Sequence, residues 1–364
     1  MKVLVTGSEG FIGKNLIVHL KERKNIEVLT YCREDDLSAL DTKVKQVDFI
    51  FHLAGINRPK EETEFFEGNS NLTLSLCQSV RNTKRNIPIV YTSSIQAELN
   101  NPYGRSKLEA EKYLQDLEKE TGNSVYIYRL PNVFGKWAKP NYNSAVATFC
   151  YNILNDLPVQ VNDANAIINL VYVDDVVAGF LDVLSGGVFK PIDPVYKITV
   201  GELKNQIHAF KESKVTHISE RVGTGLVRAL YSTYISYFTP QQFIYPLVKH
   251  EDPRGVFVEM LKTKDSGQFS FFTAHKGVTR GGHYHHTKTE KFLVIKGEAR
   301  YCFRHIVTNE RFEIFASGSK PEIVETIPGW THDITNVGEE EMIVMLWANE
   351  IFDREKPDTY ASKV

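Results

Sequence analysis

The sequence predicts two folds in one chain of 364 residues: a doubly wound parallel α/β sheet and, after it, an all-β jelly roll. Up to about residue 185, apolar strand-like runs alternate with helical patterns, which is typical of a parallel sheet wound with helices. A glycine-rich turn follows the first strand-like run. From about residue 252 onward, short strands recur between Gly and Pro turns, which favours a jelly roll with little helix.

The first element is expected to be a buried strand over Lys2–Thr6, because this run is largely apolar and β-branched. It leads into Gly-Ser-Glu-Gly-Phe-Ile-Gly at residues 7–13 and then into a helical pattern. Gly7 permits a tight turn, Gly10 lets the backbone approach a pyrophosphate, and Gly13 lets the helix pack against the strand. A phosphate would lie at the helix N-terminus, so the segment predicts a Rossmann-type dinucleotide site rather than an ordinary Gly-rich turn. Its expected cofactor contacts are Gly7, Gly10, Phe11, Ile12 and Gly13.

The G-x-x-G-x-x-G spacing resembles that of the extended short-chain dehydrogenase/reductases. The next expected strand, Glu27–Cys32, ends at Arg33, about twenty residues past the glycines, where an acidic residue would bind the ribose hydroxyl of NAD. Arginine at this position favours the 2′-phosphate of NADP, so NADPH is the predicted cofactor. Three acidic residues follow at once, at positions 34–36, and weaken this preference.

The same resemblance implies the catalytic residues. The strand over Ile89–Ser94 would deliver the catalytic serine, Ser94 rather than Ser93, and Tyr103 and Lys107 supply the family's Tyr-x-x-x-Lys motif. One helical turn places the last two side chains on one face, so the Lys107 ammonium is expected to lower the pKa of the Tyr103 phenol from about 10 and make it a usable proton donor. Only eight residues separate Ser94 from Tyr103, fewer than in most extended relatives. Further implied cofactor contacts are Leu53, Ala54, Gly55, Tyr103 and Lys107.

Two later segments complete this pattern. Residues 129–135 read Arg-Leu-Pro-Asn-Val-Phe-Gly, and residues 171–176 read Val-Tyr-Val-Asp-Asp-Val. In relatives these positions border a nucleotide-sugar pocket and anchor the substrate domain. The resemblance therefore implies that Arg129 and Asn132 bind the substrate.

The C-terminal part carries a metal-site pattern, G-x5-H-x-H-x4-E-x6-G, between Gly277 and Gly297. Strand alternation would put His283 and His285 on one face, and Glu290 on the neighbouring strand could point back toward them. A tight turn at Pro-Gly-Trp-Thr-His, residues 328–332, offers His332 as a fourth ligand. Together these runs resemble the two signature motifs of metal-binding cupin barrels, so the predicted ligands are His283, His285, Glu290 and His332. If only three bind, His285 is the one expected to serve the substrate instead.

Composition fits two compact domains, expected at residues 1–245 and 246–364. The net charge of −2 gives no basic footprint for nucleic acid, and no apolar run approaches the length of about 20 residues that spans a bilayer. Four scattered cysteines, Cys32, Cys77, Cys150 and Cys302, lack disulfide or metal spacing and suggest the cytoplasm. We also expect a homodimer that binds neither nucleic acid nor membrane.

The whole chain resembles a family of bifunctional capsular-polysaccharide enzymes that join an extended short-chain reductase to a C-terminal cupin. Runs such as His-Leu-Ala-Gly-Ile-Asn-Arg-Pro at 52–59, Asn-Tyr-Asn-Ser at 141–144 and His-His-Thr-Lys at 285–288 carry this resemblance. It implies a UDP-linked 4-keto-6-deoxy-N-acetylhexosamine substrate on the route to UDP-N-acetyl-L-fucosamine. The cupin would epimerise C3, and the reductase would then deliver hydride from NADPH to the C4 ketone. Zinc is the expected metal, because this reaction needs a redox-silent Lewis acid.

Two alternatives remain at this point. The cupin could be a metal-stiffened binding or dimerisation module, with the reductase as the only enzyme. The chain could also be an NADP-binding regulator without catalysis, but that would require loss of Tyr103 or Lys107, and both are present.

Overall fold

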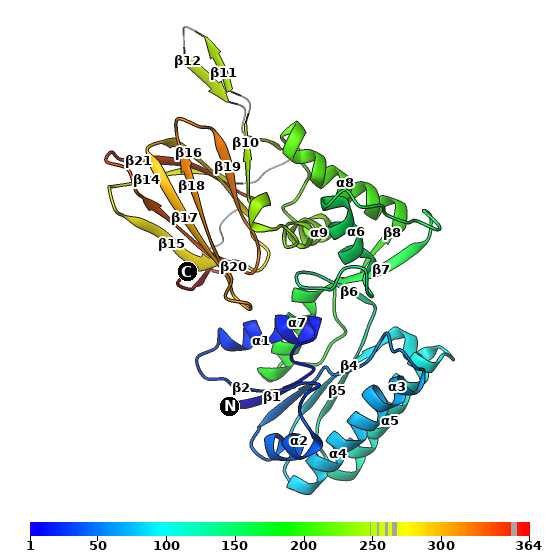
Figure 1. Cartoon of the computed structure of the whole chain (residues 1–364). Helices are drawn as coiled ribbons and strands as arrows, with labels where there is room; N and C mark the ends of the chain where they lie inside the picture. The colour runs from blue at the N-terminus through cyan, green and yellow to red at the C-terminus, as the bar shows by residue number, and fades with distance from the viewer. Residues whose placement is uncertain (248, 253–254, 259–260, 264–267, 351–354) are drawn as a thin grey trace. The chain divides into compact units, whose positions relative to one another are not determined.

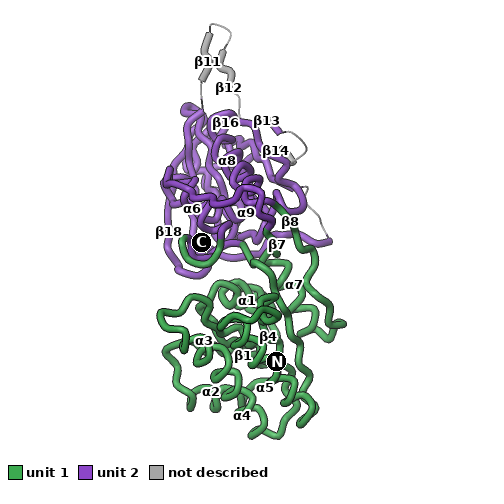
Figure 2. The backbone as a smooth tube through the Cα atoms, turned by 90° about the vertical axis from the view of Figure 1, so that its right-hand side faces the viewer, with its two compact units in different colours: residues 1–134, 141–144, 168–198 green, residues 135–140, 145–167, 199–364 purple. Residues whose placement is uncertain are grey.

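A computed structural model describes residues 1–247, 249–252, 255–258, 261–263, 268–350 and 355–364. The contacts within the chain divide it into two compact units, each made of several segments (Figure 2). Unit 1 comprises residues 1–134, 141–144 and 168–198, and unit 2 comprises residues 135–140, 145–167 and 199–364. The segments of the two units alternate along the chain. The domain boundary at residues 245/246 stays a prediction.

Unit 1 is built on a parallel sheet of five strands in the order β2-β1-β3-β4-β5. The strands are β1 (Lys2–Thr6), β2 (Glu27–Tyr31), β3 (Phe49–His52), β4 (Ile89–Ser94) and β5 (Val125–Leu130). Strand β1 lies between β2 and β3, with Val3 opposite both Val28 and Phe49. The carboxyl ends of these strands therefore meet at one edge, where the predicted cofactor and catalytic segments begin.

Helices cover both faces of this sheet, as a doubly wound fold requires (Figure 1). Helices α1 (Phe11–Lys21) and α7 (Val173–Leu184) contribute Leu16, Leu20 and Phe180 to the core on one face. Helices α2 (Leu37–Val44), α4 (Leu72–Thr83) and α5 (Pro102–Thr121) bury apolar side chains in the core on the other face, among them Leu40, Leu76 and Leu114. The predicted Rossmann-type fold is confirmed.

Shorter elements complete unit 1. A three-residue helix α3 (Thr63–Phe65) runs into a π-helical turn η1 (Phe66–Asn71), which continues into α4. A 3₁₀ turn η2 (Ile95–Glu98) connects β4 to the segment before α5. Three strands form a small separate sheet in the order β6-β7-β8, namely β6 (Asn132–Phe134), β7 (Ile167–Tyr172) and β8 (Tyr196–Thr199).

Unit 2 contains three packed helices beside its β-rich part: α6 (Ala145–Leu154), α8 (Val200–Thr216) and α9 (Gly225–Ile235). Helix α8 is the longest of the three. It starts with a reciprocal capping box, in which the Thr199 hydroxyl accepts from the Glu202 N–H and the Glu202 carboxylate accepts from the Thr199 N–H. Phe210 of α8 packs against Tyr231 and Tyr234 of α9.

The β-rich part of unit 2 consists of two five-stranded sheets (Figure 1). The first has the order β10-β19-β16-β21-β14, with β10 (Ile244–Pro246), β14 (Gln268–Ala274), β16 (Glu290–Lys296), β19 (Glu322–Thr326) and β21 (Met342–Ala348). The second has the order β18-β17-β20-β15-β22, with β15 (Thr279–Tyr284), β17 (Glu298–His305), β18 (Arg311–Ser317), β20 (Trp330–Asn336) and β22 (Tyr360–Ala361). All pairings in both sheets are antiparallel, and Phe292 of β16 contacts Tyr301 of β17 and His332 of β20 between the sheets. The predicted jelly-roll cupin class is confirmed.

The remaining elements are short. They are η3 (Pro240–Gln242), the parallel pair β9 (Ile218–Ser219) and β13 (Lys262–Thr263), and the hairpin of β11 (Lys249–Asp252) and β12 (Gly255–Val258). The short strands expected from about residue 252 onward begin with β12, whereas Pro253, Arg254 and Glu259 lie outside the described residues. Among the helices that the structure describes, none is both long and apolar enough to cross a membrane.

Candidate active site and metal centre

The glycine turn after β1 has the geometry expected of a dinucleotide site. Gly7 has a positive φ of 66°, and a Cβ there would lie 2.7 Å from Ala54 N, so the predicted residues 7 and 54 are in direct contact. A Cβ on Gly13 would lie 2.2 Å from the carbonyl oxygen of Gly7, so only glycine lets α1 approach this closely. Gly10 is the N-cap of α1 and has no side chain to cap it, so the first-turn N–H groups of α1 can face an anion.

A buried polar network lies beneath this turn. The Thr6 hydroxyl is 2.7 Å from His52 Nδ1, and His52 Nε2 is 2.8 Å from the Thr73 hydroxyl, which itself donates to the carbonyl of Asn69. Thr73 must therefore accept from Nε2–H, which fixes the tautomer of His52. Burial, with a further contribution from the charge of Lys107, lowers the pKa of His52 to about 3. His52 is thus a neutral residue of this buried network.

Asn69 joins this network to helix α5. Its amide oxygen accepts from the N–H of Ile56 at 2.8 Å, and its amide nitrogen donates to the carbonyl of Ile56 and to the hydroxyl of Ser106 on α5. A Cβ on Gly55 would lie 2.8 Å from the Asn69 amide oxygen and 3.0 Å from Lys107 Nζ. Asn69 lies in the π-helical turn η1, and such turns are frequent at functional sites. The sequence analysis missed Asn69, because a π turn has no periodic signature.

The structure brings together the three predicted catalytic residues. Ser94 ends β4 and its hydroxyl interacts with the Tyr103 phenol, whereas the Ser93 hydroxyl donates to Glu111 at 2.5 Å. The ammonium of Lys107 is buried, donates to the carbonyl of Thr92 at 2.9 Å and lies 4.9 Å from the centre of the Tyr91 ring. These contacts favour Ser94 over Ser93 as the partner of Tyr103.

The short gap between Ser94 and Tyr103 is closed by a tight packing contact. Asn101 caps α5 by accepting from the Gly104 N–H at 2.7 Å, and Pro102 begins the helix. A Cβ on Gly104 would lie 2.2 Å from the carbonyl oxygen of Gln96 and 2.5 Å from that of Leu99. Glycine at 104 therefore lets the first turn of α5, with Tyr103, sit against the η2 segment that follows Ser94.

The expected effect of Lys107 on the Tyr103 pKa is wrong for this structure. Burial raises the pKa of Tyr103, and only its hydrogen bond with Ser94 acts to lower it. The cause lies in the tertiary packing, because the ammonium of Lys107 is directed to the Thr92 carbonyl. Burial also lowers the pKa of Lys107 to about 8, against a smaller opposing effect of Glu111. Tyr103 thus stays protonated at neutral pH, which suits a proton donor.

The two predicted substrate residues have different surroundings. The guanidinium of Arg129 makes a bidentate ion pair with the buried Glu111, with bonds of 2.9 and 2.6 Å, and a further bond to Glu98. Arg129 also lines a cavity of about 490 Å³ in unit 1. The exposed Asn132 donates to the carbonyl of Asn169 at 3.2 Å. Arg33, the predicted NADP residue, is exposed in the turn after β2. The substrate and cofactor assignments stay predictions.

The four predicted metal ligands come together inside the β sandwich. One donor atom from each of His283, His285, Glu290 and His332 lies within 4.8 Å of the others. His283 on β15 faces His332 on β20, after a register shift at Gly281 that turns this end of the strand. Glu290 begins β16 in the opposite sheet, so it approaches the histidines from across the sandwich. The sequence suggested instead that Glu290 lies on a strand next to that of His283. His285 lies one residue beyond the end of β15, which corrects the prediction that it shares a strand with His283.

The donor set fits a divalent metal. Oε2 of Glu290 lies 3.2 Å from His285 Nε2 and 3.3 Å from His332 Nε2. Ligand atoms about 2.0–2.1 Å from one tetrahedral ion are roughly 3.3–3.5 Å apart, so these separations match two edges of such a site. The other Glu290 oxygen, Oε1, lies 2.8 Å from the ammonium of Lys288.

The protonation states also suit metal binding. Burial, with His332 and His285 nearby, lowers the pKa of His283 to about 3, and burial lowers the pKa of His332 as well. Burial alone would raise the pKa of Glu290, but His285 and His332 hold it well below its usual range. Neutral imidazoles and an ionised carboxylate are the forms that bind a metal ion.

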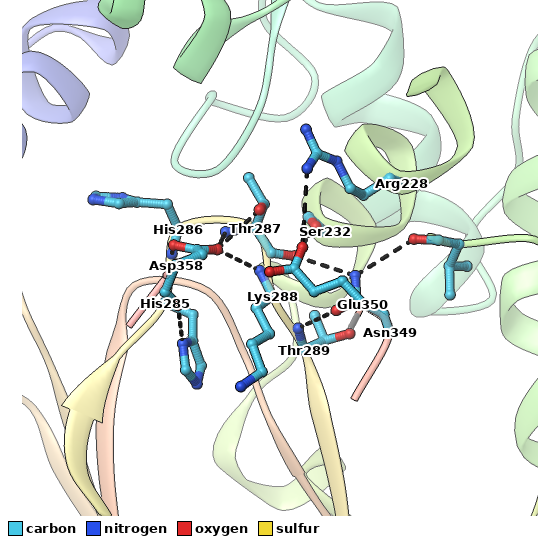
Figure 3. A network of polar contacts seen from close by, with 11 residues as sticks. Arg228, Ser232, His285, His286, Thr287, Lys288, Thr289, Asn349, Glu350 and Asp358 are labelled. Atoms are coloured by element: carbon cyan, nitrogen blue, oxygen red, sulfur yellow. Dashed lines mark hydrogen bonds and ion pairs between the residues drawn. The ribbon is translucent and has the colours of Figure 1, made fainter. Parts of the chain in front are cut away.

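The loop between β15 and β16 is held by residues far away in the sequence (Figure 3). The Asp358 carboxylate accepts from the N–H groups of His286 and Lys288 at 2.8 and 2.7 Å. The amide oxygen of Asn349 accepts from the Thr289 N–H at 2.9 Å, and the Ser232 hydroxyl donates to the carbonyl of Thr287. The sequence analysis missed Asp358, Asn349 and Ser232, and no motif marks them.

Comparison with known proteins is consistent with these two sites. Residues 3–198 match the NAD dependent epimerase/dehydratase family, and residues 250–360 match the polysaccharide biosynthesis C-terminal domain. The chain is 60% identical over 368 residues to the UDP-2-acetamido-2,6-beta-L-arabino-hexul-4-ose reductase of Pseudomonas aeruginosa, covering 100% of this chain and 99% of that relative.

Solved structures show the same likeness. The crystal structure of the capsular polysaccharide assembling protein CapF from Staphylococcus aureus aligns with 100% of both chains, at 41% identity and a TM-score of 0.70. UDP-glucuronic acid 4-epimerase from Bacillus cereus, in complex with UDP-glucuronic acid and NAD, is 17% identical with a TM-score of 0.56. That match covers 65% of this chain and 98% of the epimerase, and it concerns the fold alone.

Proposed function

This chain belongs to the NAD dependent epimerase/dehydratase family, and from that membership we propose that it is a bifunctional enzyme of nucleotide-sugar metabolism. The proposed substrate is UDP-2-acetamido-2,6-dideoxy-β-L-arabino-4-hexulose, and the proposed product is UDP-2-acetamido-2,6-dideoxy-β-L-talose, for capsule or O-antigen synthesis. The observation that carries the proposal is the juxtaposition of Ser94, Tyr103 and Lys107 beside the glycine turn of unit 1. The full-length likeness to a 4-ketohexulose reductase supports the substrate class.

The reductase step needs a proton and a hydride at the C4 carbonyl. NADPH supplies the hydride to C4 when it is bound. Tyr103 donates its phenolic proton to the C4 oxygen, and the Ser94 hydroxyl hydrogen-bonds with this reacting pair. The Ser94 hydrogen bond, which acts to lower the pKa of Tyr103, stabilises the phenolate that forms until a solvent proton restores the phenol. The buried ammonium of Lys107, beside Gly55, would instead contact the bound cofactor.

We propose that the cupin part performs the preceding C3 epimerisation. The C3 proton is acidic only while C4 is a ketone, so epimerisation must come before reduction. His283, His285, Glu290 and His332 would hold one divalent metal, proposed to be zinc, which supplies a Lewis acid for the negative charge that develops during enolisation. Their lowered pKa values keep His283 and His332 neutral and ready to bind it.

The competing proposal is a 4-ketoreductase whose cupin is only structural or dimerising. The name of the Pseudomonas aeruginosa relative, which mentions a reductase and no epimerase, favours it. The two proposals differ in what happens to the substrate before any NADPH is added.

The deciding experiment is incubation of the purified, metal-loaded protein with the 4-keto substrate in deuterated water without NADPH. The bifunctional proposal expects deuterium at C3, read by mass spectrometry of the recovered sugar nucleotide. Chelation, or His283→Ala combined with Glu290→Ala, should stop the exchange, whereas Tyr103→Phe should exchange normally. Absence of C3 label above the uncatalysed rate in wild type would remove the epimerase and leave the reductase with a structural cupin.

Two further proposals concern assembly and location. The four cysteines are free thiols, which supports a reducing compartment such as the cytoplasm. We propose a homodimer in solution, which sedimentation of the purified protein checks directly.

A further inference from the structure

The four proposed ligands are not held in the same way. His283, Glu290 and His332 are members of strands β15, β16 and β20, so ladder hydrogen bonds fix their backbones. His285 lies in the loop after β15. Its position therefore depends on whatever holds that loop.

Asn349, Ser232 and the N–H of Gly329 each contact this loop, and Asp358 adds four hydrogen bonds through its carboxylate (Figure 3). One carboxylate oxygen accepts from the N–H of His286 at 2.8 Å, and the other accepts from the N–H groups of Thr287 and Lys288 at 2.6 and 2.7 Å. The Thr287 hydroxyl adds a fourth bond of 2.9 Å. Three successive N–H groups that converge on one carboxylate form an anion-binding nest. The anion bound in this nest is the carboxylate of Asp358, a residue of the same chain.

The main chain of Asp358 contacts the ligand side chain as well. Its carbonyl oxygen makes a short hydrogen bond with His285 Nδ1. A carbonyl oxygen can only accept, so Nδ1 carries the hydrogen and Nε2 is left to face Glu290 Oε2, 3.2 Å away. A hydrogen bond of this kind to the second ring nitrogen orients metal-binding histidines and raises their basicity.

The segment that carries Asp358 is anchored independently of the loop. Residues Tyr360 and Ala361 form β22 and pair with β15 at Tyr284 and His283. The Thr331 hydroxyl donates to the carbonyl of Ser362 at 2.8 Å, and the Arg304 guanidinium donates to the carbonyl of Lys363 at 2.7 Å. Asp358 therefore lies two residues before β22, a strand of the same sheet that carries His283 and His332.

We propose that Asp358 is a positioning residue of the metal centre, which fixes His285 as the fourth ligand through its carboxylate on the loop and its carbonyl on Nδ1. This inference rests on the proposed metal site. It resolves the choice between three and four ligands in favour of four, because an imidazole held with Nε2 toward Glu290 is placed to bind the same ion. Asp358 acts through His285 and contacts no substrate.

The test measures metal binding by the full-length protein and not turnover. The probes are Zn²⁺, titrated against a competing chelator, and Co²⁺, whose visible spectrum reports the number and type of ligands. Asp358→Ala should weaken Zn²⁺ binding roughly 10- to 100-fold, the range for loss of an outer-shell partner. Asp358→Asn, which keeps the shape but offers one acceptor oxygen, should give an intermediate loss. Asp156→Asn removes the same charge from an exposed carboxylate elsewhere in unit 2 and should change nothing.

A double-mutant cycle with His285→Ala separates positioning from a merely structural role. If Asp358 acts through His285, Asp358→Ala should reproduce the Co²⁺ spectrum of His285→Ala and cost no further affinity when added to it. Losses of Zn²⁺ affinity that add up in the double mutant would overturn the inference. A lower melting temperature of metal-free Asp358→Ala with unchanged Zn²⁺ affinity would overturn it as well. If Asp358→Ala does not fold, Asp358→Asn decides by the same criterion.

The outcomes also distinguish this inference from the proposed function. Wild type that binds neither Zn²⁺ nor Co²⁺ would overturn the metal site and the inference together. Wild type that binds both ions, with the same affinity and spectrum in Asp358→Ala, would leave the metal site standing and overturn the role of Asp358 alone.

Discussion

Gly104→Ala should damage catalysis without touching a catalytic side chain. The added Cβ would lie 2.2 Å from the carbonyl oxygen of Gln96, and real Cβ atoms do not come closer than 3.0 Å, so the first turn of α5 or the η2 segment must move by at least 0.8 Å. Both contacting groups are backbone carbonyls and cannot rotate away. The shift falls between Ser94 and Tyr103, the pair whose approach this glycine permits.

The size of the effect follows from this displacement. Overpacking typically lowers the free energy of unfolding by about 1–3 kcal/mol. Alanine in place of glycine in a helix raises it by about 1 kcal/mol, so the protein should stay folded. A misplacement of about 1 Å at a reacting centre costs on the order of 10²-fold in rate. We therefore expect kcat for ketone reduction to fall about 100-fold while the affinity for NADPH stays within a few-fold of wild type.

The assay follows NADPH oxidation by absorbance with saturating 4-keto substrate, and cofactor affinity is measured separately by fluorescence. Gly179→Ala is the matched control, since it is also a helical glycine in unit 1, but its Cβ would meet the flexible end of the Ile192 side chain. That variant should keep near-normal turnover. A folded Gly104→Ala enzyme with kcat within about threefold of wild type would refute the packing argument.

Three further outcomes are expected. Arg33→Ala should reduce the preference for NADPH over NADH roughly 10- to 100-fold, because it removes one or two charge-assisted hydrogen bonds to the 2′-phosphate. Equal kcat/KM values for both cofactors in wild type would contradict the assignment of Arg33. Tyr103→Phe should lower ketone reduction by ~10²–10⁴-fold with cofactor affinity kept, and more than about a tenth of normal turnover would contradict the general-acid role. Burial lowers the pKa of Lys107 to about 8, so the ammonium is lost as pH rises through that value and kcat/KM for NADPH should fall. A profile that stays flat up to about pH 10 would show that this charge is not needed.

Local spacing explains which features the sequence can predict. The glycine turn depends on strand and helix geometry over a few residues, whereas the approach of Glu290 to His283 depends on the packing of two sheets. The fold class followed from the same local patterns, since alternating strands and helices favour a parallel sheet.

Long-range packing explains what the sequence did not predict. The raised pKa of Tyr103 depends on burial by the surrounding chain, which the helical spacing of Lys107 does not reveal. Asp358 lies 73 residues from His285 in the sequence. No periodic sequence pattern relates the segment before β22 to the loop after β15. Asn69 was missed because its role arises from a π turn that aims one amide at both Ile56 and Ser106.

The interleaving of the two units limits how this protein can be divided. Three segments of each unit alternate along the chain, which joins them at five points. A fragment that began at residue 246 would lack α6, α8 and α9, which belong to the same unit as the β sandwich. A single crossover that exchanges the β sandwich for that of a relative would split this unit. Functional hybrids should therefore require several matched crossovers, or a parent similar enough to supply the same packing surfaces.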